Sequence, residues 1–149
     1  MAANYRAEER YLQQFCDLSE WITNELSCRM WPLPVLFAQV SQQSHGEFRK
    51  LFGELSTALD QRVAPDAYGC MEAVLACHPA LPDGCRHLLS QLGRTLGRYD
   101  LEGQLREIMR IHEEAGQMLK KHREGAEDRL RCCQTLGLCA GLALAILLL

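Results

Sequence analysis

Apolar residues recur every three or four positions along most of the chain, which is the period of an amphipathic α-helix. Two stripes are especially regular: Tyr11, Phe15, Leu18, Ile22 and Leu26, and then Phe48, Leu51, Phe52, Leu55 and Leu59. Nowhere does an alternation of apolar and polar residues last long enough to predict a β-strand. The pattern therefore predicts an all-α fold, a small bundle of five to six helices.

Prolines and turn residues set the limits of the first three predicted helices. The first helix ends near Arg29, because the prolines in the segment Trp31–Pro34 disfavour α geometry in the residues before them. A second helix begins within that segment, where proline is tolerated in a first turn, and continues through Val40. The segment Ser44–Gly46 separates it from the third helix, which carries the second apolar stripe.

Capping residues mark two shorter helices in the middle of the chain. Asp66 is expected to accept hydrogen bonds from the first backbone amides of a fourth helix. A fifth helix opens at Pro82 or Asp83, since proline favours the start of a helix. Gly93 and Gly97 are predicted to close this fifth helix in a turn.

Asp100 is predicted to cap the last and longest helix, in which no proline occurs from Leu101 onward. Its first core stripe comprises Leu101, Leu105, Ile108 and Ile111 or His112. Residues 113–131 are markedly polar, and we expect them to form a solvated stalk. Gly116 and Gly125 are the positions at which the helix could be interrupted, because glycine is a poor helix former.

The last 18 residues, 132–149, are apolar apart from Gln134 and Thr135. A run of this length is at the lower limit for crossing the hydrocarbon core of a bilayer, which is about 30 Å thick. A buried core helix is the alternative, but a chain of 149 residues has little other surface to enclose a helix that is apolar on every side. The sequence therefore predicts a helical domain at residues 1–131 and a transmembrane segment at 132–149.

Charge and small residues predict how this segment lies in a membrane. Basic residues precede it and no charged residue follows it, so the domain is expected to stay in the cytoplasm. These basic residues are Lys120, Lys121, Arg123, Arg129 and Arg131. Small residues recur at every fourth position of the segment: Cys133, Gly137, Gly141 and Ala145. Such a stripe predicts packing against another membrane helix, for instance in a homo-oligomer, although glycine and alanine are also common in membrane helices generally.

Composition narrows the possible functions. The net charge of −3 argues against a nucleic-acid partner, since proteins that bind nucleic acid carry clustered basic faces. Met1–Arg10 is charged and lacks the apolar core of a secretory signal.

Four of the eight cysteines fall among apolar residues and are predicted to be reduced structural thiols: Cys16, Cys70, Cys77 and Cys85. Zinc is the alternative, but the cysteines and histidines between residues 70 and 87 lack the short spacing of structural zinc sites.

Motifs of catalysis are missing from the sequence. It contains no glycine-rich phosphate loop, no metal-binding pair of histidines on one helix and no nucleophile elbow. We therefore expect a non-enzymatic interaction protein without cofactor, metal or small-molecule substrate. Candidate partner contacts are the arginines of the first and last helices, which a solvated charged face explains equally well: Arg6, Arg10, Arg106 and Arg110.

Two motifs in the second half of the chain resemble those of a known family. They are Leu92-Gly93-Arg94-Thr95-Leu96-Gly97-Arg98-Tyr99-Asp100, followed by Gln104, and Leu136-Gly137-Leu138-Cys139-Ala140-Gly141-Leu142 with Leu147-Leu148-Leu149. With the long charged helix between them, they are similar to the LGxxLGxxD and LGxLxGL…LLL motifs of the stage III sporulation protein AB family. Gly93, Gly97, Asp100 and Gln104 match this family's pattern, and we expect a turn and a helix cap there.

This resemblance implies a function beyond what residue patterns predict. Members are membrane proteins of endospore-forming bacteria, made in the mother cell as part of the assembly that links it to the forespore. Their soluble domain is similar to the cytoplasmic helical domains of the type II secretion F protein. The resemblance thus implies a scaffold that connects other subunits of a membrane complex to a cytoplasmic, secretion-type ATPase.

Two options for the N-terminus and two alternative functions accompany this interpretation. Family members generally begin with a hydrophobic segment, so either Met1 is internal and a first membrane helix precedes it, or this member has a single C-terminal span. A tail-anchored regulator of the Bcl-2 type, which binds partner helices, would also fit the length and the tail. However, the Asn-Trp-Gly-Arg helix start of that family is absent. A generic membrane-associated interaction protein is the remaining alternative.

Overall fold

The computed structural model describes residues 2–29, 31–97 and 100–149, with only the backbone described for 2–5, 126 and 129. Arg98 and Tyr99 of the family motif and the side chain of Arg129 lie outside the described part. The described chain forms six helices and no strand: α1 Ala2–Cys28, α2 Leu33–Gln43, α3 Glu47–Asp60, α4 Ala67–Ala76, α5 Asp83–Thr95 and α6 Leu101–Leu148. The predicted all-α fold is therefore confirmed.

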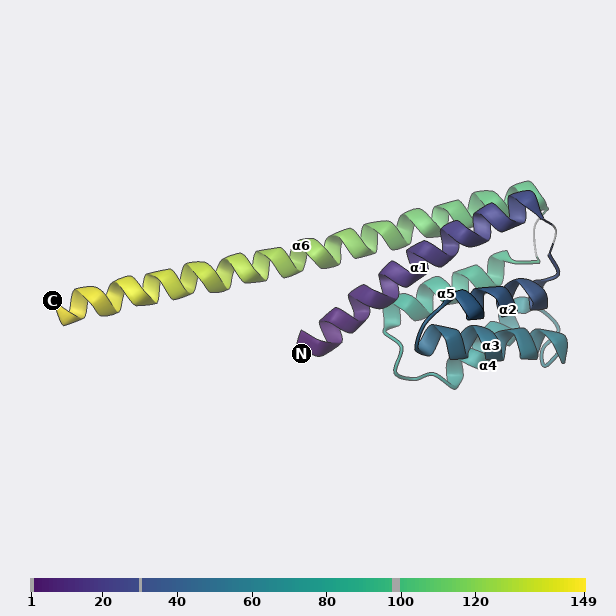
Figure 1. Cartoon of the computed structure of the whole chain (residues 1–149), viewed down its shortest axis with the longest axis horizontal. Helices are drawn as coiled ribbons and strands as arrows, with labels where there is room; N and C mark the ends of the chain where they lie inside the picture. Colours follow the sequence, from purple (N-terminus) through teal and green to yellow (C-terminus); the bar gives the residue numbers. More distant parts are fainter. Residues whose placement is uncertain (1, 30, 98–99) are drawn as a thin grey trace.

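Helices α1 and α6 form a long antiparallel pair, and the C-terminal part of α6 continues beyond it (Figure 1). Ser19 Oγ lies 2.7 Å from His112 Nδ1, whereas Arg123 Nε donates to Glu9 Oε1 at 3.0 Å. The residue number thus falls on α1 as it rises on α6. We call the interface between α1 and α6 the seam. Residues of α6 that are fully buried or nearly so recur at helical spacing along it: Ile108, Ile111, Ala115 and Leu119.

Helices α2 to α5 pack together on one side of this pair, where α5 packs against both α1 and α6 (Figure 1). Aromatic rings join them to α1: Tyr11 lies 5.3 Å from Phe48, and Phe48 lies 5.9 Å edge-on from Phe52. Phe52 in turn stacks on Phe37 of α2 with centroids 5.7 Å apart. These three phenylalanines are at most 1% exposed. They belong to one hydrophobic core to which all six helices contribute buried residues.

The turn from α5 into α6 is set by residues of the LGxxLGxxD motif. Gly97 has a φ of 83°, a left-handed conformation that glycine adopts without strain. Asp100 caps α6, because its Oδ1 accepts from the backbone N–H of Gly103 at 3.0 Å. The backbone N–H of Gln104 donates to the carbonyl of Asp100 at 2.8 Å, which closes the first turn of α6.

Gly93 corrects the expectation of a turn, because it lies inside α5. A Cβ at this position would come within 2.8 Å of the Met71 Cβ, so the glycine permits α4 and α5 to approach closely. The physical requirement at residue 93 is therefore a missing side chain rather than an unusual backbone angle.

The polar stretch of α6 is also continuous. Neither Gly116 nor Gly125 interrupts the helix, which runs for 48 residues. At about 1.5 Å per residue, its length is about 70 Å. One continuous helix therefore connects the packed domain to the apolar C-terminus and forms a rod between them.

Replacing Gly93 with alanine should destabilise the domain. Overpacking costs about 1–3 kcal/mol, and the clashing Met71 Cβ is fixed to the backbone of α4. That cost exceeds the gain in helix propensity, which is about 0.5–1 kcal/mol. Gly116→Ala is the matched control, because no atom lies within 4 Å of its added Cβ, and it should stabilise the protein. Urea unfolding of the full chain in detergent, followed by tryptophan fluorescence, measures both; equal midpoints would contradict the close approach.

Candidate functional site

The C-terminal part of α6 is an apolar helix that touches nothing else in the described chain. Its large side chains are 60–107% exposed: Leu136, Leu138, Leu142, Leu144, Ile146, Leu147, Leu148 and Leu149. Among the described residues, α6 is the one helix long and apolar enough to cross a membrane, and none of its apolar stretch is buried. A core helix would be covered by the rest of the domain, so this segment is a candidate membrane span.

One polar side chain at the start of the apolar run has its hydrogen bond within the helix. Thr135 Oγ1 donates to the carbonyl of Arg131 one turn earlier, at 2.9 Å. This bond satisfies the hydroxyl within the helix, which matters because lipid offers no hydrogen-bond partner. Before it, charged exposed residues surround the helix, and they are the membrane-proximal end of the predicted stalk: Lys120, Lys121, Arg123, Glu124, Glu127, Asp128 and Arg131.

The small residues of the tail lie open along the exposed helix. Cys133 and Ala145 are exposed, and a Cβ placed on Gly137 or Gly141 would meet no atom within 4 Å. A second helix could therefore approach the backbone closely along this stripe.

The four candidate arginines do not form one surface. Arg6 and Arg10 are exposed on the end of α1 that lies toward the tail, while Arg106 and Arg110 are exposed near the start of α6 (Figure 1). Arg110 is held by Glu107 at 3.0 Å and Glu114 at 3.4 Å, both on its own helix. The structure thus separates the arginines into a pair near the tail and a pair far from it.

The motif arginine Arg94 has a structural partner that the sequence pattern did not indicate. Its guanidinium lies 4.7 Å above the ring of Tyr68, and its Nη2 donates to the Tyr68 hydroxyl at 3.1 Å. Both residues border a surface groove, together with Leu33 and Leu96. The motif therefore combines the turn into α6 with a fixed cation at the end of the domain farthest from the tail (Figure 1).

Three of the four cysteines expected among apolar residues are buried in the core, whereas Cys77 is exposed at the end of α4. Burial raises the pKa of the Cys85 thiol to about 12, and burial likewise raises the pKa of Cys16. Such thiols are poor nucleophiles. In the described part of the chain, no three His, Cys, Asp or Glu side chains are grouped so that they could hold a metal ion.

The residue patterns did not predict a buried histidine that lies between two glutamates. His78 lies between Glu47 and Glu54 of α3, and both glutamates are within hydrogen-bond distance of its ring. The spacing of the two glutamates, two turns apart on one helix face, was the available signal. Nothing in the sequence indicates that His78 faces them, since it lies beyond a loop.

The architecture defines the class of the protein: a small all-helical domain whose last helix continues into a candidate membrane span. The chain belongs to the stage III sporulation protein AB family, whose family model matches residues 1–149. The fold is also that of a solved structure described as "Stage III sporulation protein AB (SpoIIIAB)", with a TM-score of 0.70 and 21% identity over 79% of this chain and 94% of that one. No curated protein matches the chain significantly in sequence. Family membership replaces the alternative of a Bcl-2-type regulator.

Replacing Leu142 with arginine should abolish stable membrane insertion. A charge at the centre of a membrane helix costs about 2.5–3.5 kcal/mol, and Leu142 lies within the short apolar run. Leu130→Arg introduces the same side chain at an exposed position before the run and should leave insertion intact. Alkaline carbonate extraction of cell membranes measures the difference; a Leu142→Arg protein that stays in the pellet would argue against the span.

Proposed function

We propose that this protein is a non-enzymatic scaffold in the sporulation complex that connects the mother cell to the forespore. In this proposal, the C-terminal helix sits in the mother-cell membrane and the helical domain lies in the cytoplasm. The domain links the membrane-embedded subunits to a cytoplasmic, secretion-type ATPase. Sporulation itself follows from family membership; the scaffold role and the ATPase are the proposed parts.

The continuity of α6 carries the proposal. One helix supplies the buried seam residue Leu119, the polar stalk and the apolar tail without an intervening loop. A helix bends little over a few turns, so the position of the domain relative to the bilayer is fixed by the helix itself. Such a rod is suited to hold a partner at a defined distance from the membrane.

The chemistry of the domain supports a role in binding. The ring nitrogens of His78 are both engaged by carboxylates, and the thiols of Cys16 and Cys85 have raised pKa values because they are buried. Neither type of group is available as a base or nucleophile in this arrangement. We therefore propose no catalytic residue and no cofactor.

The position of the arginines favours one contact surface for the ATPase. Arg106 and Arg110 lie near the start of α6, far from the tail, where a cytoplasmic partner has access (Figure 1). Arg6 and Arg10 lie toward the tail, and in a membrane they would face the narrow space next to the bilayer. We propose the first pair as the ATPase contact and the second as a surface for membrane-embedded subunits.

Deletion of the gene in its native host should prevent the formation of heat-resistant spores. The wild-type gene should restore them, whereas a gene that encodes Leu142→Arg should not, since its domain would be released from the membrane.

Arg106→Glu with Arg110→Glu should reduce co-purification of the ATPase from sporulating cells. Arg6→Glu with Arg10→Glu is the matched control and should retain the ATPase. Normal spore yield after deletion would contradict the proposed role, and equal co-purification in both variants would contradict the ATPase surface alone.

The small-residue stripe is proposed as the packing surface of the membrane helix. Replacing Gly137 and Gly141 with leucine should weaken lateral assembly, because the added side chains keep helices apart. The leucines also add apolar surface to the helix, so the protein should stay in the membrane. Cross-linking in membranes measures assembly, and carbonate extraction measures insertion. Unchanged cross-linking in the double variant would exclude the stripe as the packing surface.

A further inference from the structure

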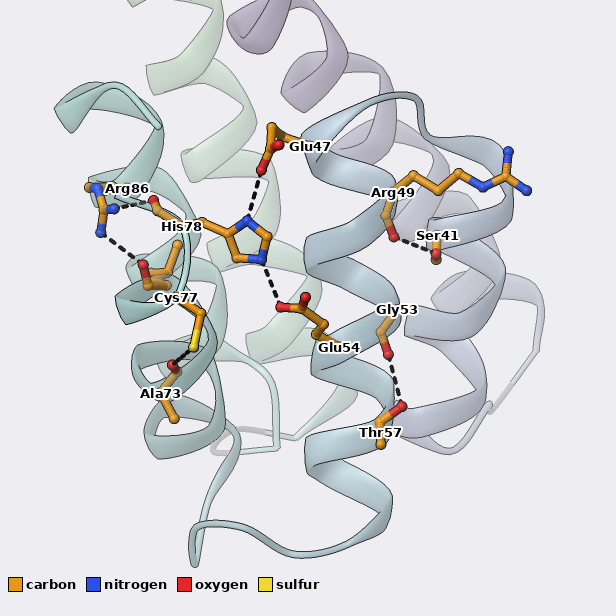
Figure 2. Close-up of polar contacts among 11 residues, drawn as sticks. Ser41, Glu47, Arg49, Gly53, Glu54, Thr57, Ala73, Cys77, His78 and Arg86 are labelled. Atoms are coloured by element: carbon orange, nitrogen blue, oxygen red, sulfur yellow. Dashed lines mark hydrogen bonds and ion pairs between the residues drawn. The ribbon is translucent and has the colours of Figure 1, made fainter. Parts of the chain in front are cut away.

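A buried histidine joins two parts of the helical domain through both of its ring nitrogens. His78 follows α4, at the start of the turn that leads to α5, and its side chain is 7% exposed. Its Nδ1 lies 2.8 Å from Glu47 Oε2, and its Nε2 lies 2.7 Å from Glu54 Oε2. Figure 2 shows the imidazole between the two carboxylates, both of which belong to α3. The ring therefore bridges α3 and the α4–α5 turn.

With both glutamates ionised, the two short distances favour protons on both nitrogens. A neutral imidazole carries one N–H, so its other nitrogen would present a lone pair to a carboxylate oxygen within 2.8 Å. Only the imidazolium donates a hydrogen bond to each glutamate, and such charge-assisted bonds are the stronger kind. We propose that His78, as an imidazolium, is a proton-dependent clamp that holds the α4–α5 turn against α3 and makes the packing of the domain sensitive to pH.

The other polar groups around the ring fix its position rather than compete for its protons. On α5, Arg86 donates to the carbonyls of Leu75 and Leu81 at 3.1 and 3.3 Å, and also to the carbonyl of His78 itself. This guanidinium anchors the backbone of the turn, as Figure 2 shows. The histidine backbone is thus held from α5 while its ring is held from α3.

Two further titratable groups approach the clamp from α1 and α4. On α1, burial and then the charge of Glu47 raise the pKa of the Tyr11 hydroxyl, so this tyrosine stays neutral around pH 7. The Cys77 thiol at the end of α4 is exposed and donates to the carbonyl of Ala73 at 3.7 Å. Neither group supplies a second positive charge that would displace the proton from His78.

The direction of the pH effect follows from the surroundings of the ring. Burial lowers the pKa of His78, but the hydrogen bonds and charges of Glu54 and Glu47 outweigh burial, so the pKa is raised above its ordinary value. The clamp is therefore complete below the ordinary pKa of histidine, and it is lost as the pH rises through the raised value.

The direct test is a titration of the full-length protein in detergent micelles by NMR with ¹⁵N-labelled histidine. At pH 6, the ring of His78 should show two protonated nitrogens. Its midpoint should lie at a higher pH than that of His45, which is exposed and serves as the internal reference. A single protonated nitrogen at pH 6, or a midpoint at or below that of His45, would overturn the clamp.

Thermal unfolding provides the second test. The Tm of the wild-type protein should exceed that of His78→Gln by several degrees at pH 6, and the gap should shrink as the pH is raised to 8.5, because the clamp is lost only in the wild type. His45→Gln makes the same change at an exposed site and should follow the wild type at each pH. A gap that is independent of pH would refute a proton-dependent role.

A milder variant keeps the test decisive if His78→Gln fails to fold. Glu54 is 52% exposed, so Glu54→Gln retains the shape of the side chain at little cost to packing. It removes one carboxylate from the ring and should lower the NMR midpoint of His78 while leaving that of His45 in place. An unchanged midpoint would show that the carboxylate does not hold the proton.

Discussion

The packing of α1 along the first part of α6 is the constraint on which the rest of the structure depends. It buries one stripe of each helix, with Phe15 and Ile22 on α1 and Ile108 and Ala115 on α6 all at 0% exposure. Burial of this kind supplies most of the stability of a helix in water, because isolated helices are marginal. The stripe on α6 ends at Leu119, the last of its described side chains to be buried. The seam therefore determines where the domain ends and where α6 must find another environment.

The smaller helices depend on this seam through the aromatic rings that meet it. Tyr11, in the same apolar stripe of α1 as Phe15 and Ile22, contacts Phe48 of α3, and α3 in turn packs against α2 and α4. Polar contacts add register to this apolar packing. Ser19 Oγ donates to the carbonyl of Cys16 and lies 2.7 Å from His112 Nδ1, a position that a slip of one turn would not preserve.

How much could be read from the sequence depended on whether the deciding signal was local. Pro32, Asp66 and Asp100 act on their own neighbours, and the helices begin where these residues predicted. The role of Gly93 depends on Met71 of another helix, and His78 meets a glutamate 31 residues earlier in the chain. Periodicity shows which face of a helix is buried, but the face that it meets is set by the packing of the whole core. For the same reason the exposure of Cys77, at a helix end among apolar residues, was not predicted.

The seam and the histidine clamp hold different parts of the domain together. The seam is mainly apolar, but it holds titratable groups of its own: His112 Nδ1 lies 2.7 Å from Ser19 Oγ, and His122 Nδ1 lies 3.9 Å from Glu8 Oε2. The clamp acts only between α3 and the α4–α5 turn. About 20 Å of helix separates Leu119 from the apolar run that begins at Cys132. A change of protonation at His78 would therefore loosen the part of the domain beside the seam while the rod between domain and membrane keeps its length and direction.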